Sequence, residues 1–137
     1  MVAKLHNEGR MDLHQVHLNP GFTYSCGLFT APATPAVTDG SAALTEATFS
    51  GYAQVNIVWG ADALDANGNE KSTGSVCTFT HNGGGVSNTV LGYFVNDADN
   101  GLLLFSELFP SPMLMNTNGQ FISVTPKLYL GKLDPPL

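Results

Sequence analysis

Two strongly apolar runs, separated by a short polar stretch, dominate the pattern of this chain. The runs occupy residues 90–95 and 102–109, and the polar stretch occupies residues 96–101. Asn and Asp tolerate left-handed backbone angles and Gly adopts them without steric cost, so the polar stretch can reverse the chain. The pattern therefore predicts a β-hairpin. Neither run alternates cleanly between apolar and polar residues, which predicts that both faces of the hairpin are covered.

The second run presents two apolar rows, because neighbouring residues of a strand point to opposite faces. One row is Leu102, Leu104 and Leu108, and the other is Leu103, Phe105 and Phe109. We expect one row to fill the core, and the other to meet a second sheet, the N-terminal segment or a partner subunit. The candidate interface also takes two apolar residues from the N-terminal segment, and consists of Leu102, Leu104, Phe105, Phe109, Leu13 and Val16.

Further strands are predicted on both sides of the hairpin. They are expected at 22–30 (half buried), near 44–51, at 52–59, at 75–81, at 113–115 and at 120–130, where Pro126 kinks the last strand or places it at an edge. Polar, Gly-rich and Pro-rich segments predict loops at 31–41, 60–74 and 82–88, the last of them flexible, and a break at 110–112. About seven or eight short strands, with no alternation of strands and helices, predict an all-β, antiparallel β-sandwich of the jelly-roll or immunoglobulin-like type.

The two ends of the chain differ from this β pattern. Residues 1–20 contain few β-branched residues and a rough helical spacing of apolar residues, which predicts a short N-terminal helix or an ordered arm. Residues 132–137 contain Pro135 and Pro136 and are expected to form a tail. The expected organisation is therefore an arm over 1–20, a β-sandwich domain over 21–131 and a C-terminal tail over 132–137.

The composition adds that the chain is poor in charge. Of 137 residues, 43% are hydrophobic but only 12% are charged, which is about half of the usual ~25%. Two interpretations stay open: a small β domain with a neutral polar surface, or a protein whose surface is largely covered in its working state. The net charge is −6 and the five basic residues are scattered, so direct binding of nucleic acid is not expected. No apolar run approaches the ~20 residues of a membrane span, and Lys4 is not followed by the apolar region of a secretory signal.

Two cysteines, Cys26 and Cys77, each lie in a strand-like apolar context. Without a secretory signal, we expect two buried, reduced thiols. A disulfide between neighbouring strands stays open, because the sequence does not supply the geometry.

Two groups of residues have some character of a metal site. His14 and His17, with His6 upstream, would lie close together on a helix, but no acidic or Cys ligand stands at a persuasive spacing, and surface histidines are the expected reading. Residues 97–101 place Asp97, Asp99 and Gly101 as in a calcium loop, with Glu107 at the offset of the bidentate ligand. Because residues 102–105 read as a strand, a hairpin turn is favoured. No cofactor or metal is therefore expected, and Asp97→Ala is expected neither to unfold the domain nor to abolish assembly.

The sequence carries no catalytic signature. It contains no Gly-x-Ser-x-Gly elbow. The stretch His-Asn-Gly-Gly-Gly at 81–85 has only a superficial likeness to an oxyanion loop and coincides with an expected connection. Glycines next to aromatic residues at 51–52, 92–93 and 129–131 are expected to serve packing. We therefore expect a protein that is not an enzyme.

Three segments resemble small structural proteins of tailed bacteriophages. They are LTEATFSGYA at 44–53, GYFVND at 92–97 and FISVTPKLYLG at 121–131. The resemblance implies a structural role in the virion and carries no catalytic residues. It does not distinguish the capsid from the tail.

Within that family, low charge and potentially anchoring ends favour a capsid decoration (cement) protein. Such a protein would bind the major capsid protein, or other virion proteins, on the assembled shell and stabilise it by mass action. It would be made in the host cytoplasm, lie on the capsid surface and form a homo-oligomer, a dimer or a trimer, at a symmetry axis. The alternative is a domain of the tail, baseplate or fibre that serves adhesion or connection. A small hydrolase on a β-sandwich is a third class that no arrangement of residues supports.

Overall fold

The computed structural model of the protein describes residues 4–5, 23–60, 63–64, 66 and 70–130. Apart from a three-residue 3-10 turn, η1 (Ser41–Ala43), the regular structure of these residues is β, and each ladder is antiparallel. The expected all-β, antiparallel class is confirmed. Eleven strands are described, of which β1 (Lys4–Leu5), β3 (Thr45–Glu46) and β5 (Ala63–Leu64) have two residues each. Eight longer strands remain, in agreement with the expected seven or eight.

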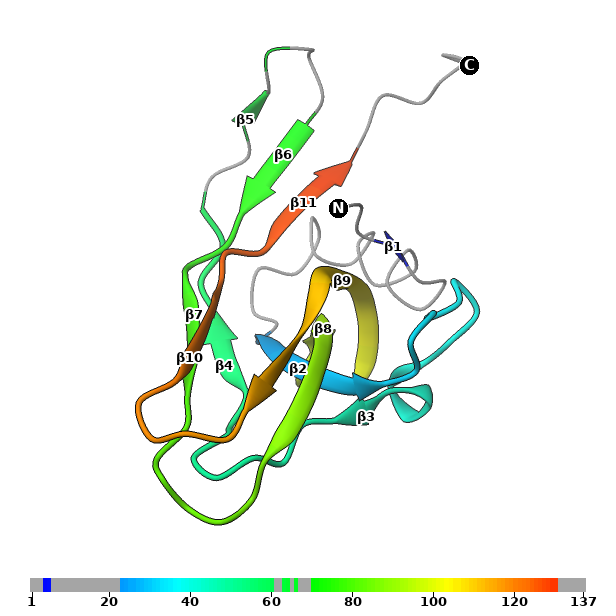
Figure 1. Ribbon diagram of the computed structural model, residues 1–137. Coiled ribbons are helices and arrows are strands. Elements are labelled where there is room, and N and C mark those ends of the chain that lie inside the picture. Colours follow the sequence, from blue (N-terminus) through cyan, green and yellow to red (C-terminus); the bar gives the residue numbers. More distant parts are fainter. Residues whose placement is uncertain (1–3, 6–22, 61–62, 65, 67–69, 131–137) are drawn as a thin grey trace.

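The first sheet is built on the predicted hairpin. β8 (Asn88–Asp97) and β9 (Leu102–Met115) form its two arms. The sheet has the order β1-β9-β8-β2-β3, in which β2 is Tyr24–Ala31, and β4 (Val55–Ile57) also pairs with β2. Figure 1 shows β2 running under this hairpin, with β3 beside it.

The second layer is a long antiparallel ribbon. β7 (Cys77–Thr80) pairs with β10 (Phe121–Val124), and β6 (Glu70–Thr73) pairs with β11 (Lys127–Leu130) and β5. The N–H of Gly74 donates to the carbonyl of Pro126 at 2.8 Å and joins the two ladders. In Figure 1 the β7–β10 part packs beside the first sheet, and β5, β6 and β11 extend beyond it.

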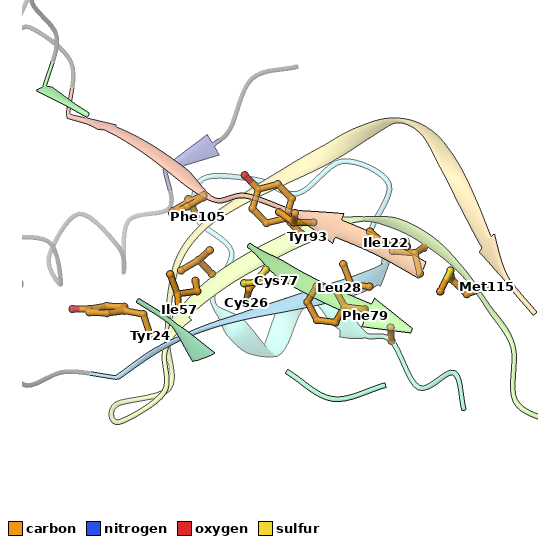
Figure 2. Packing of buried hydrophobic residues seen from close by; sticks show 14 of the residues in the cluster. Tyr24, Cys26, Leu28, Ile57, Cys77, Phe79, Tyr93, Phe105, Met115 and Ile122 are labelled. Carbon is orange, nitrogen blue, oxygen red and sulfur yellow. The ribbon is translucent and has the colours of Figure 1, made fainter. Parts of the chain in front are cut away.

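The main core lies between these two layers. Cys26 and Leu28 of β2, Tyr93 of β8 and Phe105 of β9 pack against inward residues of the second layer. Figure 2 shows these side chains meeting those of Cys77, Phe79 and Ile122. Strands β7 and β10 alternate strictly between buried and exposed residues, so each buries one face only. This alternation closes the sandwich on that side.

A β-bulge in β9 changes the two apolar rows expected for the hairpin. Val95 pairs with Phe105 and Asn96 pairs with Leu103, so that Leu104 is the extra residue. Leu104 and Phe105 therefore both lie in the main core, while Leu103 packs on the opposite face with Phe29 and Phe94. The predicted rows are wrong at this point, because a bulge shifts the alternation of a strand by one residue.

The opposite face of the first sheet carries a second, smaller apolar cluster. Its buried members are Phe29, Phe94 and Leu103, and Leu44, Leu91 and Leu108 pack against them. Because β2 contributes to this cluster as well as to the main core, six of its eight residues are buried. The prediction that 22–30 is half buried is therefore wrong, whereas the prediction that both faces of the hairpin are covered is confirmed.

Two connecting segments differ from the sequence-based expectation, and a third agrees with it. The expected loop at 60–74 contains β5 and β6, which are held by backbone pairing rather than by an apolar pattern. The expected break at 110–112 lies inside β9, where the register jumps from Leu108 opposite Gly92 to Met113 opposite Val90. Prolines fit this irregular stretch, since it requires no ladder N–H from them. The kink at Pro126 is confirmed, because it separates β10 from β11.

The expected terminal segments fall mostly outside the described residues. In the predicted arm, Lys4 and Leu5 form β1, which pairs with Ser106 and Phe105 of β9. The remaining residues of the arm, including Leu13 and Val16 and the three N-terminal histidines, lie outside the described part of the chain, as does the tail at 132–137.

Candidate functional site

The outer face of the second layer combines exposed apolar side chains with small hydroxyl side chains. Val58, Val76 and Phe121 are 75%, 61% and 63% exposed, respectively. Thr78, Thr80 and Ser123 are exposed between them. We call these six residues the uncharged face: Val58, Val76, Thr78, Thr80, Phe121 and Ser123. Large apolar side chains this exposed cost solubility, so a cluster of them marks a candidate site of association.

Backbone pairing connects the segments that carry these residues. In the β7–β10 ladder Phe121 lies opposite Thr80, and Ser123 lies opposite Thr78. The hydroxyl groups of Thr78 and Ser123 are hydrogen-bonded at 3.0 Å. After β4 the chain crosses to this layer, where the N–H of Ser75 donates to the carbonyl of Val58 at 2.9 Å. The N–H of Val58 donates in turn to Oγ of Ser75 at 3.0 Å.

Ionisable side chains are absent from the uncharged face, and the described acids lie elsewhere. Asp97 and Glu107 belong to the β8–β9 hairpin, Asp99 to its turn, Glu46 to β3, Asp39 to the loop after β2 and Glu70 to the start of β6. The nearest charged residue along these strands is Lys127, at the start of β11. Burying this face would thus desolvate no charge, and the penalty that opposes most charged contacts does not arise.

β10 also forms an edge of its ladder in the described part of the chain. It pairs with β7 on one side only. An edge strand presents backbone donors and acceptors that a further strand can use. The uncharged face and the β10 edge meet at Phe121 and Ser123.

His81 organises the loop that follows β7. Its ring is almost fully buried and stacks on Phe49 with ring centroids 6.0 Å apart. Nδ1 accepts the N–H of Gly83 at 3.0 Å, which places the ring proton on Nε2, and Nε2 donates to the carbonyl of Val86 at 3.0 Å. Both nitrogens are thus used within the loop, and neither is positioned to act on a substrate.

Ser50 holds the same loop from the other side. Its N–H donates to the carbonyl of Val86, its carbonyl accepts the N–H of Asn82, and its Oγ accepts the N–H of Val86, each at 3.0 Å. The expected flexible connection over 82–88 is instead an anchored loop. The Gly-rich oxyanion reading finds no support, since the structure uses these residues to shape the loop.

The calcium-like residues act as turn residues. The buried Asp97 carboxylate accepts the N–H groups of Asp99 and Asn100, and the side-chain amide of Asn100 at 2.7 Å. Gly101 completes the turn with a φ of 69°. Glu107 lies on β9 opposite Tyr93, whose hydroxyl donates to it at 2.8 Å. The hairpin turn is confirmed, and in the described residues no group of three or more His, Cys, Asp or Glu side chains is arranged to hold a metal ion.

Two tyrosines inside the sandwich hold their protons more tightly than in water. Tyr52 donates to Glu46 at 2.7 Å and accepts the N–H of Leu28 at 3.1 Å. Burial, and then the hydrogen bond to Glu46, raise the pKa of Tyr52. Burial and the hydrogen bond to Glu107 raise the pKa of Tyr93 in the same way. These are structural hydrogen bonds in the first sheet, away from the uncharged face.

The residues of the candidate interface proposed from the sequence lie at different depths. Leu104 and Phe105 are each 1% exposed in the chain's own core, so the folded chain does not present them to a partner. Phe109 packs against the same core and Leu102 is half-buried. Sequence reasoning missed the uncharged face, although the alternation at 76–80 and 121–124 carries a signal for it. That signal points to the residues on the opposite side of each strand from the core.

The described part of the chain contains no helix with the length and apolar character of a membrane span. Comparison with known proteins identifies no relative: no protein-family model, no curated protein and no solved structure matches this chain.

Proposed function

We propose that this protein is a non-enzymatic structural protein of a tailed-bacteriophage virion, and specifically a capsid decoration protein. In this proposal it attaches to the assembled lattice of the major capsid protein through the uncharged face. The observation that carries the proposal is the exposure of Val58, Val76 and Phe121 on a face of the second layer whose six residues carry no charge. The resemblance of the segments at 44–53, 92–97 and 121–131 to phage structural proteins supports the choice of partner.

The chemistry of the face fits a protein partner. Interface cores are depleted in charge and enriched in aromatic side chains, as at Phe121. The hydroxyl groups of Thr78, Thr80 and Ser123 and the edge of β10 can supply hydrogen bonds around this apolar centre. A subunit that binds only the assembled lattice stabilises that lattice by mass action. Copies of the chain at a symmetry axis of the shell would form a dimer or a trimer.

Substitution of the aromatic residue of the face tests the proposed attachment. Phe121→Asp places a charge that must be desolvated on binding, and we expect it to weaken binding to capsids that lack the protein at least about tenfold. Val37→Asp is the matched control, because Val37 is also exposed but lies in the loop after β2. Co-sedimentation with purified capsids measures both variants, after circular dichroism has verified their fold. Equal binding by Phe121→Asp and the wild type would rule out attachment through this face.

The location of the protein on the particle tests the proposed function itself. Antibody labelling of complete virions and tailless heads should place the protein on the heads. Heads that lack it should release DNA at a lower temperature than heads that carry it. Labelling confined to tails would instead favour the tail, baseplate or fibre role. Heat resistance that is unchanged by its loss would argue against a decoration protein.

A further inference from the structure

The two cysteines of the chain face each other across the sandwich. Cys26 belongs to β2 in the first sheet, and Cys77 is the first residue of β7 in the second layer. Both are fully buried in the main core and both are reduced thiols. Figure 2 shows their sulfur atoms next to one another near the centre of the core.

The two thiols interact directly. The hydrogen bond with Cys77 is the largest cause that raises the pKa of Cys26, and the same hydrogen bond lowers the pKa of Cys77. The Cys77 sulfur also lies 3.6 Å from the carbonyl of Ser75. Both residues belong to one buried cluster and lie on strands of facing layers, which is the arrangement that an intersheet disulfide needs.

The backbones that carry the two thiols are held in place on both sides. Cys26 pairs with Val55 of β4 and with Val95 of β8. Cys77 pairs with Val124 of β10. The pairing fixes the backbone positions of both residues, so the arrangement is a property of the sandwich rather than of a mobile loop.

We propose that Cys26 and Cys77 are a built-in site for an intersheet disulfide, which covalently joins the two layers of the sandwich when the protein meets a disulfide or peroxide oxidant. The chain contains only these two cysteines, so no other pairing within one chain competes. The inference does not depend on the proposed function. For a protein that leaves the reducing interior of a cell, the site would add a crosslink without any change in the fold.

The reaction with a disulfide oxidant balances as follows. The Cys77 thiolate, which its neighbour stabilises, attacks one sulfur of oxidised glutathione and releases one glutathione thiol. Cys26 loses its proton and attacks the mixed disulfide, and the second glutathione leaves. The two cysteines lose two electrons and two protons in total, and one glutathione disulfide becomes two thiols. Because both sulfurs are fully buried, the rate should follow transient opening of the core at β7.

Oxidation of the whole chain tests the inference. The reduced protein is incubated in native buffer with oxidised glutathione. It is then denatured in the presence of N-ethylmaleimide, which labels free thiols, and its intact mass is measured by mass spectrometry. We expect a species about 2 Da lighter that takes up no maleimide. Its melting temperature should exceed that of the reduced protein by about 10 °C, because the crosslink restricts the unfolded chain. Cys77→Ala and Cys26→Ala should instead take up one maleimide and show no such rise.

Four results would overturn the inference, and none of them needs a variant. The crosslink could form only from protein unfolded in denaturant, or the oxidised chain could melt at or below the temperature of the reduced chain. Stable glutathione adducts on both cysteines would also exclude it, since they would show that the second displacement does not occur. A native chain that stays fully reduced under conditions that oxidise a model dithiol would count equally against it.

Discussion

The hydroxyl group of Tyr52 takes the place of a strand at the edge of β2. β4 pairs with Tyr24, Ser25 and Cys26, whereas β3 pairs with Phe29 and Ala31. The N–H of Leu28 falls between these two partners and donates to the Tyr52 hydroxyl. The carbonyl of Leu28 accepts the N–H of Ala47. A buried backbone donor without a partner costs about 1–3 kcal/mol, so this side chain lets the chain leave the sheet between β3 and β4 at little cost.

Alkaline pH is expected to destabilise the fold through Tyr52 and Tyr93. The pKa of each phenol is raised in the folded chain above the ordinary value of 10.0. The associated stabilisation is therefore complete below pH 10 and is lost as the pH rises above it. We expect the melting temperature to fall from about pH 10 to about pH 12. The fall should be shallower in the double variant Tyr52→Phe, Tyr93→Phe, and identical pH profiles for variant and wild type would contradict this account.

Asp97→Ala is expected to destabilise the hairpin, a cost that the sequence alone did not indicate. The carboxylate is buried and accepts two N–H groups and one side-chain amide of its own turn. Leaving these donors without an acceptor should lower the free energy of unfolding by about 1–3 kcal/mol. Asp97→Asn keeps one acceptor oxygen and should lose less. Urea denaturation measures both, and an Ala variant as stable as the wild type would show that water replaces the carboxylate.

At the scale of elements, β2 and β8 are locked by two reciprocal pairs of a glycine and an aromatic residue. Gly27 lies opposite Phe94, and Phe29 lies opposite Gly92. A Cβ atom at Gly27 would meet the Phe94 ring, and one at Gly92 would meet the Phe29 ring and the carbonyl of Glu107. The glycines thus leave room for the two rings to lie on the sheet. This bears out the packing role expected for the strand glycine at 92.

Gly92→Ala is expected to lower the free energy of unfolding by about 1–3 kcal/mol, because overpacking forces the Phe29 ring and β9 to move. Gly85→Ala is the matched control, since a Cβ atom there has no neighbour within 4 Å. The control should be nearly neutral. Chemical denaturation followed by tyrosine and tryptophan fluorescence measures both. Equal stability of the two variants would show that the Phe29 ring is free to move aside.

At the scale of the whole molecule, one core joins two layers whose outer surfaces differ. The far side of the first sheet has its own apolar cluster around Phe29. The far side of the β7–β10 ladder exposes Val76 and Phe121 instead. Apart from Glu70 of β6, which lies beyond the β7–β10 ladder, the described acids belong to the first sheet and its loops. The first sheet thus has most of the described acids and an apolar cluster over its far side, whereas the uncharged face has neither. This difference distinguishes the uncharged face as a surface for association.

Leu104→Asp or Phe105→Asp is expected to prevent folding rather than to weaken an interface alone. Both residues lie in the main core, where an aspartate would have no partner for its charge. Leu114→Asp on the same strand is the control, because Leu114 is 53% exposed. Circular dichroism and the dispersion of NMR spectra measure the outcome. A folded Leu104→Asp chain would contradict the assignment of this residue to the core.

Much of the fold was predictable because it rests on local patterns. The turn after Asp97 follows from its Asn, Asp and Gly residues, and the kink at Pro126 follows from the missing N–H. β5 and β6 were not predictable, since the polar residues from Glu70 to Thr73 form a strand only by pairing with β11. For the candidate site, the alternation that exposes Phe121 is visible in the sequence, but its pairing opposite Thr80 is not.

By itself, the sequence determined the all-β class, the central hairpin and the burial of both its faces, because turn residues and apolar runs act over a few neighbouring residues. Only the tertiary structure decided which residues meet. The bulge at Leu104 moved Phe105 and Leu103 to opposite faces, and the pairing of two layers brought Cys26 to Cys77. Register and contact between layers depend on residues far apart in the chain, and no local pattern contains that information.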